Sequence, residues 1–535
     1  MDEILILDFG SQTTALIGRR IRELGVLSVI APGDAPLSRV LSASTRGIIL
    51  SGSPDSVYSG GAKVDRAVYD CGLPLLGICY GLQRMTFDLG GTVEALPRVE
   101  YGGIGVSLAR DNAELSAAAR AFLDGFTPGG RPRSFTAWMS HGDTLSRLAP
   151  DFVECGMSDT GYPAVVAHRQ KPWLGVQFHP ETSHCQHGSA ILASFVFKVC
   201  ACKKSWTMEG FAGQAAERLR ARVGSRVVLL LISGGVDSSV TAALLLKSLP
   251  PENVHLMYID TGLMREGETD EASTALLRLG AKRLHIIHAE REFLAGLRGV
   301  SAPEEKRRVI GDLFIRVQER EVKNLGLPDD YLLAQGTLYT DLIESGKGIG
   351  DKARLIKSHH NVGSPLVEVK RRAGALLEPL DMLYKDEVRT LGRLLGLVES
   401  MVMRHPFPGP GLAVRIPGEV TEEKCRILRA ADRVFVDELK RRQTPSGAPL
   451  YSQIWQAFAV LLPVRSVGVA GDGRKYGHVL ALRAVCSADG MTADVYPFET
   501  RDILEIATSI TNSVPEIGRV CYDVSSKPPA TIEWE

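Results

Sequence analysis

Three side chains in the first 200 residues have the types and spacing of a cysteine hydrolase. Cys79 stands in Gly77-x-Cys79-x-Gly81, after an apolar run and before a helical pattern. In that setting a sharp turn exposes the sulfur, and the helix N-terminus favours the thiolate below its free pKa of about 8.5. His179 and Glu181 follow a second apolar run and supply a base and a carboxylate that orients it. The pattern predicts attack by a thiolate on a carbonyl carbon.

A small buried cysteine is the alternative interpretation of Cys79 taken alone, since free cysteine is among the most buried residue types. The strand-to-helix context, the base and the orienting carboxylate together favour the catalytic interpretation.

A second chemical centre is the loop Ser233-Gly234-Gly235-Val236-Asp237-Ser238-Ser239, between the apolar run 227–232 and a helical pattern. Unpaired N–H groups and the positive end of the helix dipole point into one concavity there, and the glycines allow close approach. The loop therefore predicts a cradle for phosphate oxygens, although a glycine-rich turn without a ligand is the alternative. It lacks the Gly-Lys-Ser/Thr of a Walker loop, and Asp237 beside phosphates indicates a bridging metal.

Short apolar strands alternate with helical patterns around both centres. The expected strands include residues 4–8, 47–50, 73–78, 227–232, 254–260 and 284–287. Such alternation predicts parallel sheets covered by helices on both faces, with ligands at the C-terminal ends of the strands. We therefore expect the α/β class, with two doubly wound parallel-sheet domains at 1–200 and 201–400. A smaller α+β domain is expected at 401–535.

Composition limits the class of protein. The 535 residues are enough for about three to four domains. Because the formal net charge is zero, the chain has no overall positive field that would attract nucleic acid or an acidic membrane. The N-terminus has acids where a signal peptide needs bases, and no apolar run approaches the ~20 residues of a membrane span. We expect a cytoplasmic protein with reduced thiols and small-molecule substrates, without nucleic-acid or membrane partners.

The first segment resembles the class I glutamine amidotransferases in Gly77-Ile-Cys79-Tyr-Gly-Leu-Gln83 and Gly175-Val-Gln-Phe-His179-Pro-Glu181. The resemblance implies that Cys79 is the nucleophile, His179 the base and Glu181 its orienting partner. It also implies that the reaction passes through a thioester and releases ammonia from the amide of glutamine.

The same family has an oxyanion loop that corresponds to Ser51-Gly52-Ser53-Pro54. The resemblance implies oxyanion donors at the N–H groups of Gly52 and of Tyr80, the residue after the nucleophile. Ser53 replaces a glycine of the family pattern. If that position requires a positive φ, serine is strained there, so Gly52 is the preferred donor.

The second segment resembles the pyrophosphate loop of ATP pyrophosphatases, which cleave ATP to AMP and pyrophosphate while adenylylating a substrate. Gln335-Gly-Thr, Asp341-x-Ile-Glu-Ser and Lys357-Ser-His-His-Asn resemble the glutamine-hydrolysing GMP synthetase family, as does the order of the two segments. The resemblance implies ATP as a co-substrate with Mg²⁺ at Asp237. The residues it implies for ATP binding are Ser233, Gly234, Gly235, Val236, Asp237, Ser238, Ser239 and Lys357.

The final stretch, Lys527-Pro-Pro-Ala-Thr-Ile-Glu-Trp-Glu535, matches the end of that family closely. It does not have the composition of a frayed terminus, because its charged, hydroxyl and aromatic groups suit a phosphate and a purine. The resemblance implies that xanthosine monophosphate (XMP) is adenylylated and then aminated to GMP. It also implies a homodimer formed through the C-terminal domain. The residues it implies for XMP binding are Arg307, Asp341, Lys527, Thr531 and Glu533.

Two alternatives stay open at this stage. One is another amidotransferase ligase with a different acceptor, which the final stretch disfavours. The other is a binding or regulatory protein without turnover, which the filled positions Cys79, His179, Asp237 and Lys357 disfavour.

Overall fold

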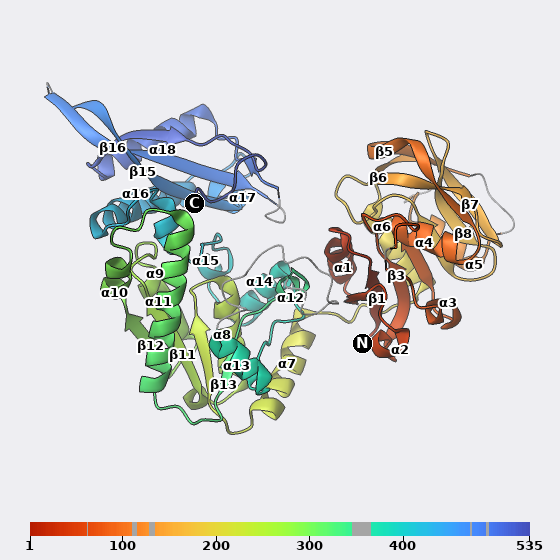
Figure 1. The fold of residues 1–535 in the computed structure, drawn as a ribbon, viewed down its shortest axis with the longest axis horizontal. Coiled ribbons are helices and arrows are strands. Elements are labelled where there is room, and N and C mark those ends of the chain that lie inside the picture. The colour runs from red at the N-terminus through yellow and green to blue at the C-terminus, as the bar shows by residue number, and fades with distance from the viewer. Residues whose placement is uncertain (61, 110–114, 128–133, 345–364, 471–472, 488–491) are drawn as a thin grey trace. The chain divides into compact units, whose positions relative to one another are not determined.

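The structure is a computed structural model that describes residues 1–535 except 61, 110–114, 128–133, 345–364, 471–472 and 488–491. The chain divides into two compact units, of which the first is Met1–Phe211 with Thr340–Lys357 and the second is Ala212–Tyr339 with Ser358–Glu535. Each unit has its own sheets (Figure 1). The predicted domain boundaries at 200 and 400 stay predictions.

The described residues of the first unit form a nine-stranded sheet. Across the sheet, its strands are β2 (Leu27–Pro32), β1 (Glu3–Asp8), β3 (Thr45–Leu50), β4 (Leu75–Ile78), β9 (Trp173–Val176), β8 (Pro163–His168), β7 (Phe152–Ser158), β5 (Thr92–Leu108) and β6 (Ser134–Arg147). The helices are α1 (Thr14–Glu23), α2 (Leu37–Val40), α3 (Ala67–Asp70), α4 (Tyr80–Asp88), α5 (Ala117–Leu123) and α6 (Gly188–Ala193), the last followed by a π-helical turn.

Only part of this sheet is parallel. Strands β2, β1, β3, β4 and β9 pair in parallel, whereas β9, β8, β7, β5 and β6 pair antiparallel. The antiparallel half follows the period-two pattern of strands with one solvated face, since Phe135, Ala137 and Met139 of β6 are buried and alternate with less buried residues. The expected α/β class is confirmed, with this antiparallel extension added.

The second unit contains a five-stranded sheet whose described strands are all parallel. Its order is β12 (Arg283–His288), β11 (Val254–Asp260), β10 (Val228–Ile232), β13 (Leu332–Ala334) and β14 (Leu376–Leu377). The helices of this part are α7 (Met208–Val223), α8 (Val236–Ser248), α9 (Glu268–Arg278), α10 (Glu290–Gly296), α11 (Pro303–Asn324), α13 (Pro365–Arg372), α14 (Lys385–Leu394) and α15 (Glu399–Val402). Helix α12 (Tyr339–Glu344) falls in the first unit from Thr340 onward. The central strand β10 leads directly into the predicted phosphate loop.

A third, mixed sheet completes the second unit. The antiparallel strands β15 (Gln456–Ala470) and β16 (Gly473–Cys486) form a long hairpin, and β17 (Asp494–Val495) and the parallel β18 (Ile517–Tyr522) flank β16. Its helices are α16 (Glu422–Arg441), α17 (Leu450–Gln453) and α18 (Thr500–Ser513). One face of the sheet packs against α16 and α18, and its apolar side chains join the main core of the unit. Within the described ranges, no helix is both long and apolar enough to cross a membrane.

Candidate functional site

Cys79 lies in a strained turn between β4 and α4. Its φ of 52° and ψ of −109° lie outside the regions that L-residues favour. The flanking glycines are required, because a Cβ on Gly77 would lie 2.6 Å from the Leu82 nitrogen. A Cβ on Gly81 would lie 2.1 Å from the Leu50 carbonyl oxygen. The turn therefore places the sulfur at the C-terminal end of a parallel strand, as the glycine spacing predicted.

His179 and Glu181 follow β9, the strand next to β4. The Nδ1 atom of His179 lies 2.7 Å from Oε1 of Glu181, which is fully buried. Burial lowers the pKa of His179, but the Glu181 carboxylate and a hydrogen bond with Cys79 outweigh that effect and raise the pKa to about 10. This raised pKa favours a protonated imidazole at neutral pH, which places a positive charge beside the sulfur. The structure brings the three predicted residues together.

Gly52 lies against the imidazole. A Cβ on Gly52 would lie 3.3 Å from Cε1 of His179 and 3.2 Å from Oγ of Ser11. Ser53 is not among the described non-glycine residues with a positive φ, so the strain considered for that serine does not arise. Tyr80 begins α4 directly after the nucleophile. Both N–H groups border the site, and their roles as oxyanion donors stay predictions.

Buried polar contacts hold the segment beside Cys79. His141 places Nε2 2.8 Å from Oε2 of the equally buried Glu100, and its Nδ1 lies 2.9 Å from the Asp143 carbonyl oxygen. Gln83 donates to the same carbonyl at 2.8 Å. Burial lowers the pKa of His141, and Glu100 opposes this effect. These contacts support the wall of the site.

The loop 233–239 joins β10 to α8 and is closed by its own hydroxyl groups. Oγ of Ser238 accepts a hydrogen bond from the Ser233 nitrogen at 3.3 Å and donates to the Gly235 carbonyl at 3.1 Å. Helix α8 begins at Val236, so the unpaired N–H groups of its first turn lie at the loop. The unpaired N–H groups at this helix start suit phosphate oxygens.

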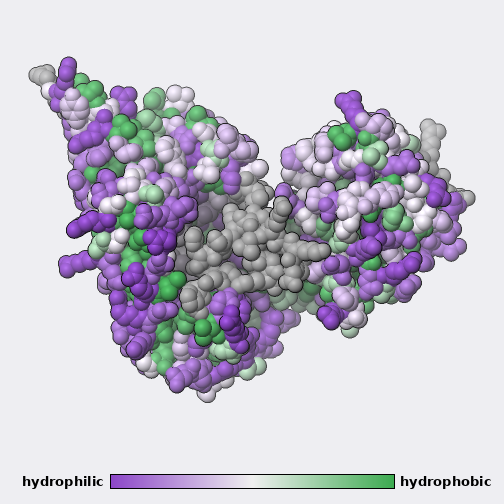
Figure 2. Space-filling model, in the orientation of Figure 1, coloured by the Kyte–Doolittle hydropathy of each residue, from purple (hydrophilic) through white to green (hydrophobic). Residues whose placement is uncertain are grey.

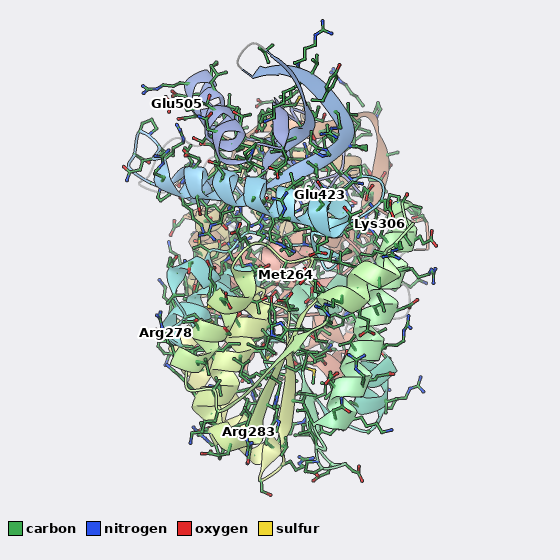
Figure 3. All side chains as sticks on the ribbon, turned by 90° about the vertical axis from the view of Figure 1, so that its left-hand side faces the viewer. Met264, Arg278, Arg283, Lys306, Glu423 and Glu505 are labelled. Carbon is green, nitrogen blue, oxygen red and sulfur yellow. The ribbon has the colours of Figure 1, made fainter. Side chains whose placement is uncertain are left out.

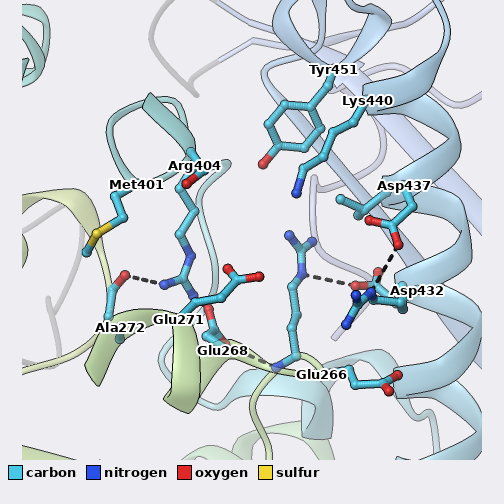
Figure 4. Close-up of a pocket in the computed structure, with 15 residues that line it drawn as sticks. Glu266, Glu268, Glu271, Ala272, Met401, Arg404, Asp432, Asp437, Lys440 and Tyr451 are labelled. Carbon is cyan, nitrogen blue, oxygen red and sulfur yellow. Dashed lines mark hydrogen bonds and ion pairs between the residues drawn. The ribbon is translucent and has the colours of Figure 1, made fainter. Parts of the chain in front are cut away.

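A cavity of about 110 Å³ lies beside the loop at Gly234 (Figure 4). Gly234 has a φ of 76°, and its carbonyl accepts a hydrogen bond from Arg404, which also pairs with Glu268. Burial and the neighbouring Arg265 lower the pKa of Arg404 to about 10. Arg265 in turn lies 3.0 Å from Asp432. The cavity is therefore lined by charge pairs, of which Arg404 contacts the loop at Gly234.

Asp237 lies in the first turn of α8 and forms an ion pair with Lys385. The Lys385 Nζ atom lies 2.6 and 2.8 Å from the two carboxylate oxygens. Gly336 packs against this turn, since a Cβ there would lie 3.0 Å from the Asp237 carbonyl carbon. The part of the chain that the structure describes has no cluster of three or more His, Cys, Asp or Glu side chains suited to a metal. One carboxylate beside a phosphate cradle fits Mg²⁺, which binds mainly to phosphates and water.

The predicted XMP-binding glutamate is held by buried partners. The fully buried Arg415 donates to both carboxylate oxygens of Glu533, at 3.1 and 2.9 Å. The Gln456 side chain donates to Oε1 of Glu533 at 2.6 Å. Thr531 donates to the Glu533 carbonyl at 2.5 Å, and the backbone of Lys527 pairs with Ala493. Lys527, Thr531 and Glu533 thus belong to one ordered segment.

The basic start of α11 meets this same segment. Lys306 is fully buried and lies 2.5 Å from Oε2 of Glu535, and Arg307 donates to the Glu535 carbonyl oxygen at 2.5 Å. Figure 3 labels Lys306, which lies near the N-terminus of α11. Of the other predicted residues, Asp341 is half-buried on α12, and Lys357 lies outside the described residues.

Comparison with known proteins covers the full length of the chain. It is 45% identical over 537 residues to the GMP synthase [glutamine-hydrolyzing] of Zymomonas mobilis, covering 100% of this chain and 98% of that protein. The enzymes of the same name from Neisseria meningitidis and Aquifex aeolicus are also 45% identical, each over 535 residues and 99% of their length, covering 100% and 99% of this chain. The chain belongs to the glutamine-hydrolysing GMP synthase family.

Two family models match separate parts of the chain. Residues 5–199 match the class-I glutamine amidotransferase model, and residues 444–534 match the GMP synthase C-terminal domain model. The first range contains the Cys79 turn with its histidine and glutamate. The second contains Lys527, Thr531 and Glu533, as expected for a member of the GMP synthase family.

Sequence reasoning missed three residues of the site. Gln177 is buried, and its Nε2 atom lies 3.7 Å from the Cys79 sulfur. It stands two residues before His179, and residues at that spacing in an extended chain point to the same face, so the sequence contained a signal for it. Lys385 is a basic residue at a helix start, where it opposes the dipole, and that signal was available in the sequence. Arg415 lies in a Pro/Gly-rich stretch, and no local pattern separates it from a linker residue.

Proposed function

We propose that this protein makes GMP in two coupled reactions. Glutamine is hydrolysed at Cys79, and ATP adenylylates XMP at its C2 oxygen, so that ammonia can displace AMP. The observation that carries the proposal is a complete Cys79–His179–Glu181 constellation in the same chain as a preformed phosphate loop. Membership of the glutamine-hydrolysing GMP synthase family supports the same pair of reactions.

The first reaction is acyl transfer to sulfur. The Cys79 thiolate attacks the side-chain carbonyl carbon of glutamine, and the N–H groups of Gly52 and Tyr80 stabilise the oxyanion. His179, kept protonated by Glu181, gives its proton to the departing ammonia, and a thioester remains. The neutral imidazole then takes a proton from water, the hydroxide attacks the thioester, and glutamate leaves as the thiolate is restored.

The second reaction is adenylyl transfer followed by amination. The XMP C2 oxygen attacks the α-phosphorus of ATP, and pyrophosphate leaves into the loop 233–239, where the N–H groups at the start of α8 stabilise its charge. Lys385, paired with Asp237 in the first turn of α8, adds positive charge beside the loop. Mg²⁺ at Asp237 would neutralise phosphate charge when bound. Ammonia then attacks C2, and AMP leaves with the former C2 oxygen.

The acceptor nucleotide is proposed to bind at the segment that contains Lys527, Thr531 and Glu533, together with Arg307. The role of Asp341, which belongs to the first unit, stays a prediction. Support comes from the order of this segment, because Arg415 fixes the Glu533 carboxylate through two hydrogen bonds. An anion near Arg307 and Lys527 would be stabilised by their charges.

We also propose that the protein forms a homodimer through its third sheet. The hairpin of β15 and β16 exposes apolar side chains, with Val469 81% exposed and Val464, Val467 and Tyr476 also exposed. Figure 2 shows apolar and polar surface interspersed along this hairpin. Sedimentation of the wild type against Val469→Asp tests this surface, and an unchanged dimer would place the interface elsewhere.

The function is tested by an acceptor panel. The protein is incubated with ATP, Mg²⁺, glutamine and either XMP, IMP or UMP, and the aminated product, AMP and pyrophosphate are measured. XMP alone should be converted, with equal amounts of GMP, AMP and pyrophosphate. Preferred amination of IMP or UMP, or formation of ADP in place of AMP, would contradict the proposal.

A further inference from the structure

A single buried arginine holds the segment proposed to bind XMP. Arg483, on β16, is fully buried and donates four hydrogen bonds. Its Nε bonds the Ile532 carbonyl at 2.8 Å, Nη1 bonds Asp523 Oδ2 and the Ser525 carbonyl at 2.9 Å, and Nη2 bonds the Thr531 carbonyl at 2.9 Å. An arginine side chain has five N–H donors, so four of them end on this one segment.

The four bonds reach both ends of the segment. Asp523 and Ser525 precede Lys527, whereas Thr531 and Ile532 lie directly before Glu533. The guanidinium therefore closes the segment into a loop with Lys527 between its two points of attachment. Lys527 lies inside this loop and Glu533 lies directly after it, so the positions of both proposed contacts depend on this set of four hydrogen bonds, here called the Arg483 clamp.

The guanidinium of Arg483 lies beside a small cluster of buried apolar side chains. Arg483 pairs with Phe458 across the β15–β16 ladder, on the face of the sheet opposite α16 and α18. The cluster consists of Phe458, Val460, Ala481, Val485, Ala493 and Ile532. Asp523, 2.9 Å away, supplies the countercharge. Hydrogen bonds in such surroundings are costly to lose, because water does not readily replace them.

We propose that Arg483 is a positioning residue for the acceptor nucleotide. It does not touch the nucleotide, but it keeps Lys527 and Glu533 in the geometry that binds it before the nucleotide arrives. The inference rests on the proposed binding of XMP by this segment. Pre-organisation of this kind lowers the ordering cost of binding, so its loss appears in the affinity for XMP.

The test compares Arg483→Met, Arg483→Lys and the wild type with ammonia as the nitrogen donor. Arg483→Met should raise the KM for XMP at least about tenfold, with the KM for ATP and glutamine hydrolysis changed less than about twofold. Arg483→Lys, which keeps the charge, should give a smaller rise. Hydrogen exchange of residues 523–535 without XMP should be faster in the Met variant, and saturating XMP should restore most of kcat.

Arg22→Met is the matched control. Arg22 is also buried but lies in the first unit, where it donates to the side chain and the carbonyl of Ser28. Its loss should leave the KM for XMP and the exchange of residues 523–535 at wild-type values. If Arg483→Met does not fold, Asp523→Asn, which removes the countercharge and keeps one oxygen acceptor, should show the same changes at smaller size.

Variants of Lys527 and Glu533 distinguish a failure of the Arg483 proposal from a failure of the proposed XMP site. If Lys527→Ala raises the KM for XMP while both Arg483 variants leave it and the exchange rates unchanged, the positioning role of Arg483 is overturned. If Lys527→Ala and Glu533→Gln leave the KM for XMP unchanged, the proposed XMP site itself is wrong, and the inference falls with it.

Discussion

Glu181→Gln removes the charge that keeps His179 protonated and leaves the side-chain volume almost unchanged. The carboxylate is fully buried, 2.7 Å from Nδ1, so bulk water does not compensate for its loss. Since burial lowers the pKa of His179, the pKa should fall from about 10 toward or below the ordinary value of 6.5. At neutral pH most imidazole would then be neutral, and the Cys79 thiolate would lose its cation.

The expected loss follows from the role of such a carboxylate. Removal of the orienting acid from a comparable catalytic triad lowers kcat by about 10⁴, and acid–base catalysis itself contributes about 10²- to 10⁴-fold. Glutamine hydrolysis should therefore fall by about 10²- to 10⁴-fold. GMP formation from free ammonia should be unchanged, because Glu181 serves only the first reaction.

Glu181→Gln also changes how the free energy of unfolding depends on pH, because that dependence follows from the difference between the folded and unfolded pKa of His179. The folded pKa of His179 lies above its unfolded value, so its contribution to stability is fully present below pH 6.5 and is lost as the pH rises through about 10. The loss in the wild type is at most on the order of 5 kcal/mol. Thermal unfolding at several pH values should show this decline in the wild type and a much smaller one in Glu181→Gln.

The decisive assay is the rate of Cys79 alkylation by iodoacetamide against pH. Modification should be measured by mass spectrometry of the peptide that contains Cys79, because Cys521 is exposed and will also react. In the variant, the rate of alkylation at neutral pH should fall, since the sulfur loses the positive charge of His179 beside it. An unchanged alkylation profile, together with a loss in glutamine hydrolysis below about tenfold, would refute the assigned role of Glu181.

Three further predictions concern the two centres. Cys79→Ala should abolish GMP formation from glutamine while ammonia still supports it, and loss of both activities would contradict two separable centres. Lys385→Met should raise the KM for ATP by about tenfold, because a cation beside the phosphate loop is lost; an ATP titration with wild-type KM would remove Lys385 from the site. Gly336→Ala places a methyl group 3.0 Å from the Asp237 carbonyl carbon and should slow pyrophosphate release at least about tenfold. Gly311→Ala, whose Cβ meets nothing within 4 Å, is its matched control and should keep wild-type rates.

The sequence alone determined the features that depend on neighbouring residues. The glycines around Cys79 predicted a sharp strand-to-helix turn, and the structure shows a φ of 52° with Cβ clashes at both glycine positions. The loop 233–239 predicted a helix N-terminus with hydroxyl donors, which the structure places between β10 and α8. These patterns are readable because a turn and a helix start depend on a few consecutive residues.

Only the tertiary structure decided which distant side chains meet. Lys385 lies 148 residues from Asp237, and Arg415 lies 118 residues from Glu533. Arg483 sits within an apolar strand pattern, and its bonds to the final segment appear only once that segment covers the sheet. Such contacts are set by how elements pack, and residue order carries no local signal for them. The sequence alone predicted the two reactions, whereas the tertiary structure decided which charged side chains hold the two sites in place.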